Sequence, residues 1–204
     1  MAVQGSAPLP ACFYERDTEQ VARDLLGAVL WCTTTDGVAS GRIVETEAYL
    51  GEHDLACHAA AGLTQRTRWL YGAPGTAYVY FIYGVHWCFN AVTRAVGSPS
   101  AVLVRALEPL EGVELMRERR GDVRERDLTN GPGKLCEALG ITGAQNGIPL
   151  RKSAIEILRG VPVPDERVVV TPRIGITKSA EWPLRWYVSD NPYVSKTPKH
   201  LRPV

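Results

Sequence analysis

The stretch GTAYVYFIYGVHWCFNAVT, residues 75–93, decides the fold class because it holds two β-forming runs around a turn. Aromatic and β-branched side chains fill residues 78–82, and a second such run covers residues 85–92. A short break between two runs of this kind is typical of a β-hairpin. We therefore expect a protruding hairpin with its tip at Tyr83-Gly84. A tyrosine at such a tip is either exposed or folded back on its own strands, and the sequence leaves both open.

A second stretch, RIVETEAYL at residues 42–50, alternates in the way that a strand requires. Strand periodicity places Ile43, Glu45, Glu47 and Tyr49 on one face and the intervening residues on the other. Two carboxylates and a tyrosine on one face are unusual for a core strand. They indicate either a chemical site or an edge strand with one face in water.

The remaining periodicities predict several more strands and a few helices. We expect helices over residues 17–26, over 110–119, and from a possible cap at Asn130 to Leu139. We expect further strands over 28–33, 100–106, 155–158, 167–170, 173–176 and 184–188. No βαβ rhythm is present, so the pattern predicts a single α+β domain at residues 13–204. Residues 1–12 are expected to form a flexible N-terminal arm.

Composition restricts the function classes. The 204 residues carry a net charge of +1, so global charge does not indicate a nucleic-acid binder, and any DNA-binding face must come from local segregation. The five cysteines are scattered without metal-binding spacing. No apolar run is long enough for a membrane span. We expect a cytoplasmic protein with reduced thiols.

The residue types alone suggest a hydrolase but leave its class open. No G-x-S-x-G nucleophile motif occurs. Glu47 or Glu45 could work with Arg105 and His58 nearby, and the tyrosines could hold a planar ligand by stacking. Carboxylate, stacking rings and a protruding tip together suggest hydrolysis at a flipped nucleotide. A carbohydrate hydrolase would use the same residue types.

Five ordered segments carry a more specific signal. They are VETEAYLGEHDLACH (44–58), GTAYVYFIYGVHWCFN (75–90), VLVRALEPLEG (102–112), NGPGKLCEALG (130–140) and PLRWYVSDNPYVS (183–195). Together they resemble the alkyladenine, or 3-methyladenine, DNA glycosylases of the methylpurine type, over about residues 20–196. The resemblance implies a curved antiparallel sheet or open barrel with surrounding helices.

The resemblance also implies an activity. It implies base-excision repair, in which an alkylated purine is flipped out of duplex DNA, with deaminated and etheno purines as further candidate substrates. The N-glycosidic bond is then hydrolysed to an abasic site, without metal or redox cofactor. Nothing in the sequence requires more than a monomer. No motif lysine is placed as a Schiff-base nucleophile, so a monofunctional enzyme is expected.

The resemblance assigns roles within the reaction centre. It implies that Glu47, and not Glu45, is the general base, and that Arg105 and the backbone carbonyl of Ile174 help to hold the water. It implies a base pocket in which the purine lies between Tyr49 on one side and Tyr80 with His58 on the other. Asn90 is then the residue that reads the purine edge.

The resemblance assigns the DNA contacts as well. It implies that Tyr83 enters the minor groove, and it leaves Val85, Arg66, Arg68 and Lys134 as possible contacts to the DNA backbone. The chain departs from the family pattern at Thr67, Val85 and His86, which puts lesion preference and DNA contacts in doubt. The two other hypotheses are a non-catalytic lesion-binding module and a hydrolase of free nucleosides.

Overall fold

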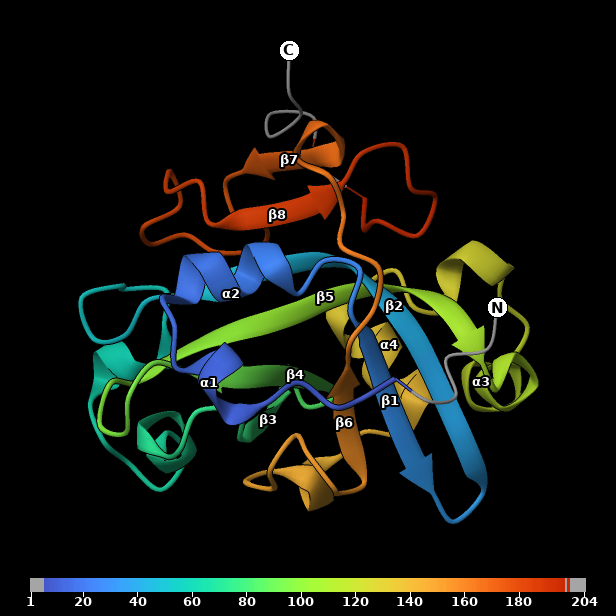
Figure 1. Ribbon diagram of the computed structural model, residues 1–204, viewed down its shortest axis with the longest axis horizontal. Helices are drawn as coiled ribbons and strands as arrows, with labels where there is room; N and C mark the ends of the chain where they lie inside the picture. The colour runs from blue at the N-terminus through green and yellow to red at the C-terminus, as the bar shows by residue number, and fades with distance from the viewer. Residues whose placement is uncertain (1–5, 197, 199–204) are drawn as a thin grey trace.

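The computed structural model describes residues 6–196 and 198, and its centre is an eight-stranded antiparallel sheet (Figure 1). The strands are β1 (Val29–Thr34), β2 (Gly37–Tyr49), β3 (Ala77–Ile82), β4 (His86–Thr93), β5 (Ser100–Glu111), β6 (Ile155–Leu158), β7 (Val168–Thr171) and β8 (Arg185–Val188). The helices are α1 (Ala11–Tyr14), α2 (Thr18–Asp24), α3 (Val113–Arg120) and α4 (Pro132–Leu139). The predicted α+β class and open antiparallel sheet are confirmed.

Strand β2 organises the sheet because one of its edges is shared by two strands. Strand β5 pairs along the other edge, from Ser40 to Tyr49. On the shared edge, residues 37–42 pair with β1 and residues 45–47 pair with β8. The sheet therefore splits into two leaves, β1 with β6 and β8 with β7, which lie in different parts of the molecule in Figure 1.

The predicted alternation of β2 is only partly correct, because the strand is bulged. Register shifts fall between Ile43 and Glu45 and between Glu45 and Thr46. A bulge sets two residues opposite one. The first shift places the extra residue, Val44, in β2, so the β2 side chains before it change face relative to those after it, whereas the second places the extra residue, Arg105, in β5. Ile43 therefore belongs to the hydrophobic core together with Ala48, and does not share the face of the two glutamates.

The hairpin is confirmed, with β3 and β4 in register from Ala77↔Ala91 to Ile82↔His86. Both tip residues have positive φ, 54° at Tyr83 and 71° at Gly84. The turn closes with a hydrogen bond of 3.2 Å from the Val85 amide to the Ile82 carbonyl, and two positive φ values are the mark of a tight type I′ hairpin turn. The Tyr83 side chain is 81% exposed, so the folded-back alternative is wrong.

Strand periodicity sorts the side chains of the hairpin and of β5 onto two faces. Val79, Phe89 and Val102 belong to the main hydrophobic core, which also contains the apolar residues of α2 and α4. Their neighbours in sequence, such as Tyr80 and Leu103, line a cavity on the other face. The same alternation that builds the core therefore supplies the walls of this cavity.

Three local predictions are wrong. Residues 173–176 form no strand, and their chain continues irregularly after β7. Strand β5 continues to Glu111, so α3 begins only at Val113. Asn130 does not cap α4, whose N-cap is Gly131, because its amide oxygen accepts a hydrogen bond from Lys134 Nζ instead.

The N-terminal segment departs from the expected flexible arm over residues 6–12. Leu9 is buried, and its amide donates to the Ile157 carbonyl at 2.8 Å. Pro8 bridges to Leu158, and α1 starts at Ala11. This part of the chain is therefore packed on the edge strand β6, while residues 1–5 of the predicted arm lie outside the described residues.

Two glycines with the same backbone conformation allow a test of how β5 and α3 are joined. Gly112 has φ 70° and ψ 30°, and Gly140 has φ 71° and ψ 29°. A Cβ at Gly112 would lie 2.1 Å from the Val38 carbonyl oxygen, whereas at Gly140 it would meet mainly the tip of Arg119 at 3.0 Å. We expect Gly140→Ala to cost roughly 1–2 kcal/mol through its left-handed conformation.

Gly112→Ala should cost about 1–3 kcal/mol more, because its methyl group overlaps backbone that must move. Urea unfolding of the two variants followed by circular dichroism measures the difference. Equal losses of stability would contradict the proposed close approach of α3 to β2.

Candidate active site

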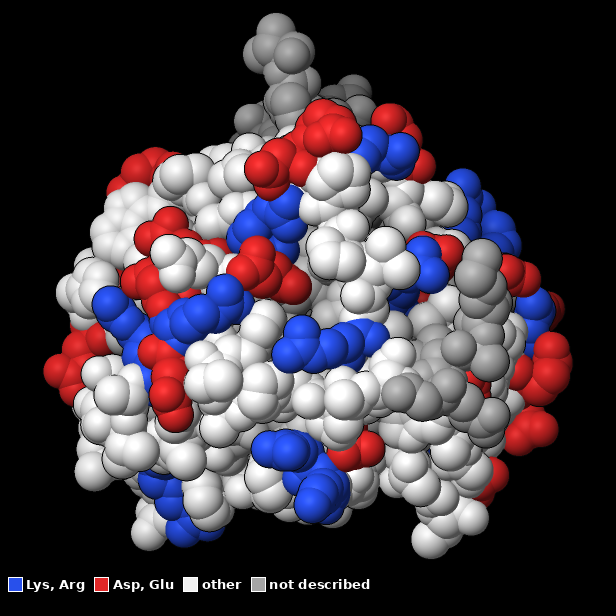
Figure 2. Space-filling model, in the orientation of Figure 1, with Lys and Arg blue, Asp and Glu red and all other residues white. Residues whose placement is uncertain are grey.

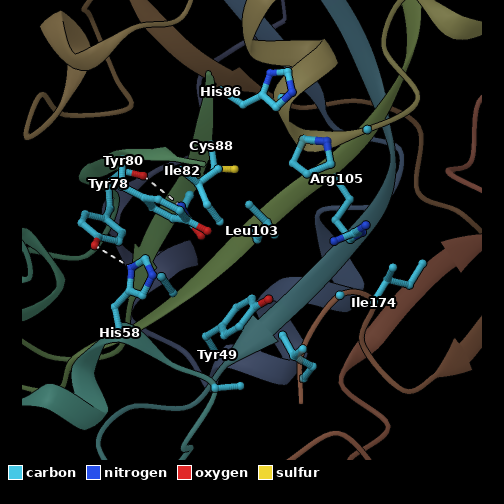
Figure 3. Close-up of a pocket in the computed structure, with 18 of the residues that line it drawn as sticks. Tyr49, His58, Tyr78, Tyr80, Ile82, His86, Cys88, Leu103, Arg105 and Ile174 are labelled. Carbon is cyan, nitrogen blue, oxygen red and sulfur yellow. Dashed lines mark hydrogen bonds between the residues drawn. The ribbon is translucent and has the colours of Figure 1, made fainter. Parts of the chain in front are cut away.

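A cavity of about 510 Å³ lies on the face of the sheet opposite the core. Its volume is typical of small-molecule sites, which span roughly 300–1,000 Å³. Figure 3 shows Tyr49, His58 and Tyr80 around one part of the cavity, with Arg105 and Ile174 on another side. The lining residues include Tyr49, His58, Tyr78, Tyr80, Tyr83, His86, Asn90, Leu103, Arg105, Lys134 and Ile174.

Strand register explains how distant parts of the sequence meet here. Tyr78 is paired with Asn90, Asn90 with Leu103, and Leu103 with Glu47. These pairs form one row across β3, β4, β5 and β2. Opposed residues on one face of a sheet lie about 5 Å apart, so the row brings the predicted base pocket and the predicted base residue to one place.

Glu47 is a fully buried carboxylate with three protein donors. The Tyr49 hydroxyl donates to Oε2 at 2.9 Å, and Arg105 Nη1 approaches the same oxygen at 3.2 Å. The backbone amide of Ile174 donates to Oε1 at 2.7 Å. Since Tyr49, Arg105 and Ile174 all line the cavity, the carboxylate lies directly behind the cavity wall.

Glu45, two residues earlier, is equally buried but has a different surrounding. Its Oε1 accepts hydrogen bonds from Arg105 Nε, from Arg185 Nε and from the Ser195 hydroxyl, and its Oε2 accepts one from the Ser195 amide. Despite burial, Arg105 and Arg185 hold the pKa of Glu45 below its usual 4.5. Glu45 is therefore an ion-paired structural group, and the water-exposed edge considered for this strand is wrong.

Arg105 joins the two glutamates. Its side chain is 9% exposed, and it pairs with Glu45 at 3.1 Å and with Glu47 at 3.2 Å. Although burial acts to lower it, the neighbouring carboxylates raise the pKa of Arg105 above its ordinary value. The guanidinium stays charged and fixes the geometry of both carboxylates.

Aromatic rings and an imidazole surround the other part of the cavity. The His58 and Tyr80 rings meet edge to face with centroids 4.4 Å apart. His58 Nδ1 shares a hydrogen bond of 2.9 Å with the Tyr78 hydroxyl. Burial and the nearby Arg66 lower the pKa of His58 to about 4, so its ring is neutral at neutral pH.

Asn90 lines the cavity floor from β4. Its Nδ2 donates to the Tyr78 carbonyl at 3.0 Å and fixes the plane of the amide. Asn90 therefore makes a hydrogen bond within the sheet and also lines the cavity. Rigid polar groups of this kind in an otherwise apolar cavity select a ligand by its hydrogen-bonding edge.

The predicted DNA contacts lie in different surroundings. Tyr83 and Lys134 line the cavity, and Val85 is 66% exposed beside the tip. Lys134 bonds Asn130 at 2.7 Å. Arg66 lies over the Tyr80 ring, and Arg68 lies over the Trp69 ring.

Several of these contacts were not foreseen from the sequence. The resemblance assigned the Ile174 carbonyl to the water, whereas the observed contact of this residue with Glu47 is made by its amide. The Tyr49 hydroxyl on Glu47 could have been suspected, because residues i and i+2 of a strand share a face. Ser195 could not, since 150 residues separate it from Glu45.

Three further observations concern the described part of the chain. No cluster of three potential metal-ligating side chains occurs there, and all five cysteines are free. None of its helices has the length and apolar character that a membrane crossing would need. On the face in Figure 2, basic and acidic side chains are interspersed and form no single-sign patch.

The cavity thus combines aromatic rings, which suit a planar ligand, with a buried carboxylate behind its wall. Comparison with known proteins gives the family. The family model for methylpurine-DNA glycosylase (MPG) matches residues 12–192. The chain therefore belongs to the methylpurine-DNA glycosylase family, and it is a DNA glycosylase, a hydrolase that acts on N-glycosyl bonds.

Individual relatives agree over nearly the whole chain. A protein of Myxococcus xanthus is 49% identical, with 93% of this chain and 94% of the relative covered. Proteins of Chlorobaculum parvum and Salinibacter ruber are 47% and 50% identical, covering 93% and 92% of this chain and 91% and 96% of their own lengths. Each is described as "Putative 3-methyladenine DNA glycosylase".

The ion pairs of Glu45 lead to a prediction about acid stability. Because the pKa of Glu45 is lowered on folding, its stabilising contribution is present above pH 4.5 and is lost as the pH falls toward the folded value. Glu45→Gln should cost about 3–5 kcal/mol at pH 7, because it leaves two buried arginines undercompensated. It should also lose less further stability than the wild type between pH 7 and pH 3.

Urea unfolding at a series of pH values measures both quantities. The exposed Glu166 provides the control, since Glu166→Gln should follow the wild-type curve. If the stability of Glu45→Gln depends on pH as the wild-type stability does, carboxyl groups other than Glu45 dominate acid unfolding.

Proposed function

We propose that this protein flips alkylated purines out of duplex DNA into the cavity and hydrolyses their N-glycosidic bond with a water activated by Glu47. The observation that carries this proposal is the buried Glu47 carboxylate, held by Tyr49, Arg105 and the Ile174 amide behind the wall of an aromatic cavity. The product is an abasic site. The description of the relatives as 3-methyladenine glycosylases supports this lesion class.

The flipped base stacks between Tyr49 and the pair formed by Tyr80 and His58. An alkylated purine such as 3-methyladenine or 7-methylguanine is cationic, and aromatic faces attract a cation by roughly 0.5–2 kcal/mol. The pKa of His58, near 4, keeps that ring neutral and removes a repulsive charge. Asn90 reads the purine edge. Neutral lesions such as hypoxanthine or ethenoadenine gain less from the rings and depend more on shape.

In the chemical step, water oxygen bonds to C1′ while the C1′–N bond breaks and its electron pair leaves with the purine. A cationic purine becomes neutral as it leaves, so it needs no protonation. Glu47 accepts the proton from water and stabilises the positive charge that develops on the sugar. Arg105 and the Ile174 carbonyl help to orient the water.

Tyr83 fills the space that the flipped nucleotide vacates. Its exposed ring lies at the tip of a rigid turn and lines the mouth of the same cavity. Flipping costs a few kcal/mol of lost stacking, which an inserted side chain partly offsets. Val85, Arg66, Arg68 and Lys134 then contact the DNA backbone. Since one chain supplies every group named here, the protein acts as a monomer.

The enzyme is monofunctional. Lys134, which lines the cavity, has its Nζ bound to Asn130 and lies 4.0 Å from Asp127. An amine whose nitrogen is already hydrogen-bonded in this way is poorly placed to attack C1′ as a Schiff-base nucleophile. Borohydride added during turnover should therefore trap no covalent complex with DNA.

The role of Glu47 is tested with duplex oligonucleotides that contain 7-methylguanine, hypoxanthine or ethenoadenine, followed by alkaline cleavage of abasic sites. Glu47→Gln should lower single-turnover excision by at least about 100-fold, in the range expected for loss of a general base. Glu111→Gln, on the far part of β5, should keep wild-type activity.

Two results would count against the proposal. If the wild-type protein produces no strand breaks on any of the three lesions, excision of these purines is refuted. If the Glu47→Gln variant excises as fast as the wild type, the general-base role is refuted. Release of bases from free nucleosides, with no activity on duplexes, would favour a nucleoside hydrolase.

The role of Tyr83 is tested by Tyr83→Ala, which removes the ring from the tip. Excision from duplex DNA should fall roughly 10-fold or more, because about 1–3 kcal/mol of stacking is lost. Excision from a single-stranded oligonucleotide should change much less, since no partner strand closes behind the base. Val161→Ala removes another exposed side chain and serves as control. Equal losses on both substrates would contradict intercalation.

A further inference from the structure

A second buried ion pair, Arg173–Asp54, lies next to the cavity without lining it. Arg173 Nη1 meets Asp54 Oδ2 at 2.5 Å, and Nη2 meets Oδ1 at 2.8 Å, so both oxygens are bound in a fork. Both side chains are fully buried. The fork lowers the pKa of Asp54 and raises that of Arg173, so the pair is ionised in the folded protein.

Arg173 also supports Tyr49. Its guanidinium carbon lies over the Tyr49 ring, 4.6 Å from the centroid. Because Tyr49 lines the cavity and Arg173 does not, the guanidinium contacts the ring from outside the cavity. Within the described residues, Arg173 Nε has no hydrogen-bond acceptor. The guanidinium group contacts the Tyr49 ring instead. Arg173 Nη1 also binds the Ala48 carbonyl at 2.9 Å, between Glu47 and Tyr49 in sequence.

Each member of the pair is attached to a segment that enters the site. Arg173 directly precedes Ile174, whose amide binds Glu47 at 2.7 Å. Asp54 accepts hydrogen bonds from the Leu50 and Ala56 amides, and this turn leads to His58 in the cavity wall. The pair therefore ties the Ile174 segment and the His58 segment to the end of β2, although 119 residues separate its members.

Stability alone does not account for this arrangement. The desolvation cost of a buried ion pair can equal its Coulombic gain, so an apolar pair of similar volume would serve folding as well. An apolar side chain, however, cannot bind a backbone carbonyl, a carboxylate and a ring face at fixed angles. The planar fork of arginine does this, and the flexible ammonium of lysine does not.

We propose that Arg173, with Asp54 as its anchor, is a positioning residue that holds the Ile174 amide on Glu47 and supports the Tyr49 ring from outside the cavity. This inference rests on the proposed function of Glu47 and deepens it. Displacement of a reacting group by about 1 Å can cost about 100-fold in rate. A loosened Ile174 amide would also remove one of the three donors that hold Glu47.

The test uses Arg173→Lys, which keeps the charge and loses the fork, and Asp54→Asn, which keeps the shape and loses the anion. The matched control is Arg23→Lys, which alters an exposed arginine–aspartate pair with Asp165. Single-turnover excision of ethenoadenine and 7-methylguanine is measured from pH 5 to pH 9, with affinity for undamaged duplex and thermal unfolding as further readouts.

We expect both variants to lose about 10-fold or more in excision rate at neutral pH. The acid limb of the pH–rate profile should move from its wild-type position, while affinity for undamaged duplex stays within about twofold of wild type. Arg23→Lys should match wild type in every readout. If the pair has a structural role alone, the excision rate should fall by the same factor at every pH, and the shape of the pH–rate profile should not change.

The outcomes separate the two proposals. A wild-type protein inactive on both lesions defeats the proposed function and this inference with it. Two results with an active wild type overturn this inference alone. One is that both variants keep the wild-type pH profile, and the other is that both excise at the rate of the Arg23→Lys control. If one variant does not fold, the other decides, and unfolding of both would assign the pair to the fold and overturn the positioning role.

Discussion

The site depends on one constraint, which is that carboxylates buried inside the protein require positive partners at close range. Glu45, Glu47 and Asp54 are fully buried, and three arginines, Arg105, Arg173 and Arg185, lie against them. An isolated buried carboxylate would take up a proton, because its charged form is poorly solvated. The arginines allow Glu45 and Asp54 to remain ionised away from water.

The same constraint separates two glutamates that lie on the same strand face. Glu45 accepts four hydrogen bonds from three residues, Arg105, Arg185 and Ser195. Of these three, only Arg105 lines the cavity. Glu47 has three donors, each from a residue in the cavity wall. A water that enters the cavity therefore meets the partners of Glu47 and none of the groups unique to Glu45.

The sequence predicted the parts of the fold that depend on local pattern. The hairpin, its tip and the central strand follow from period-two alternation and turn chemistry, and the choice of Glu47 over Glu45 followed from the resemblance. The bulges in β2 were not predictable, because they depend on a strand edge shared between β1 and β8. Residues 173–176 have the β-branched residues of a strand, yet Arg173 turns to Asp54, which no local pattern encodes.

Arg105 binds both glutamates through different nitrogens, Glu45 through Nε and Glu47 through Nη1. Since this one rigid group joins the two carboxylates, a change at Glu45 is expected to alter the position of Arg105 on Glu47. Effects of substitutions at these three residues should therefore fail to add, as is general for residues of one hydrogen-bonded network. Glu45, Glu47 and Arg105 therefore form one set of charges, which the fold and the proposed catalysis share.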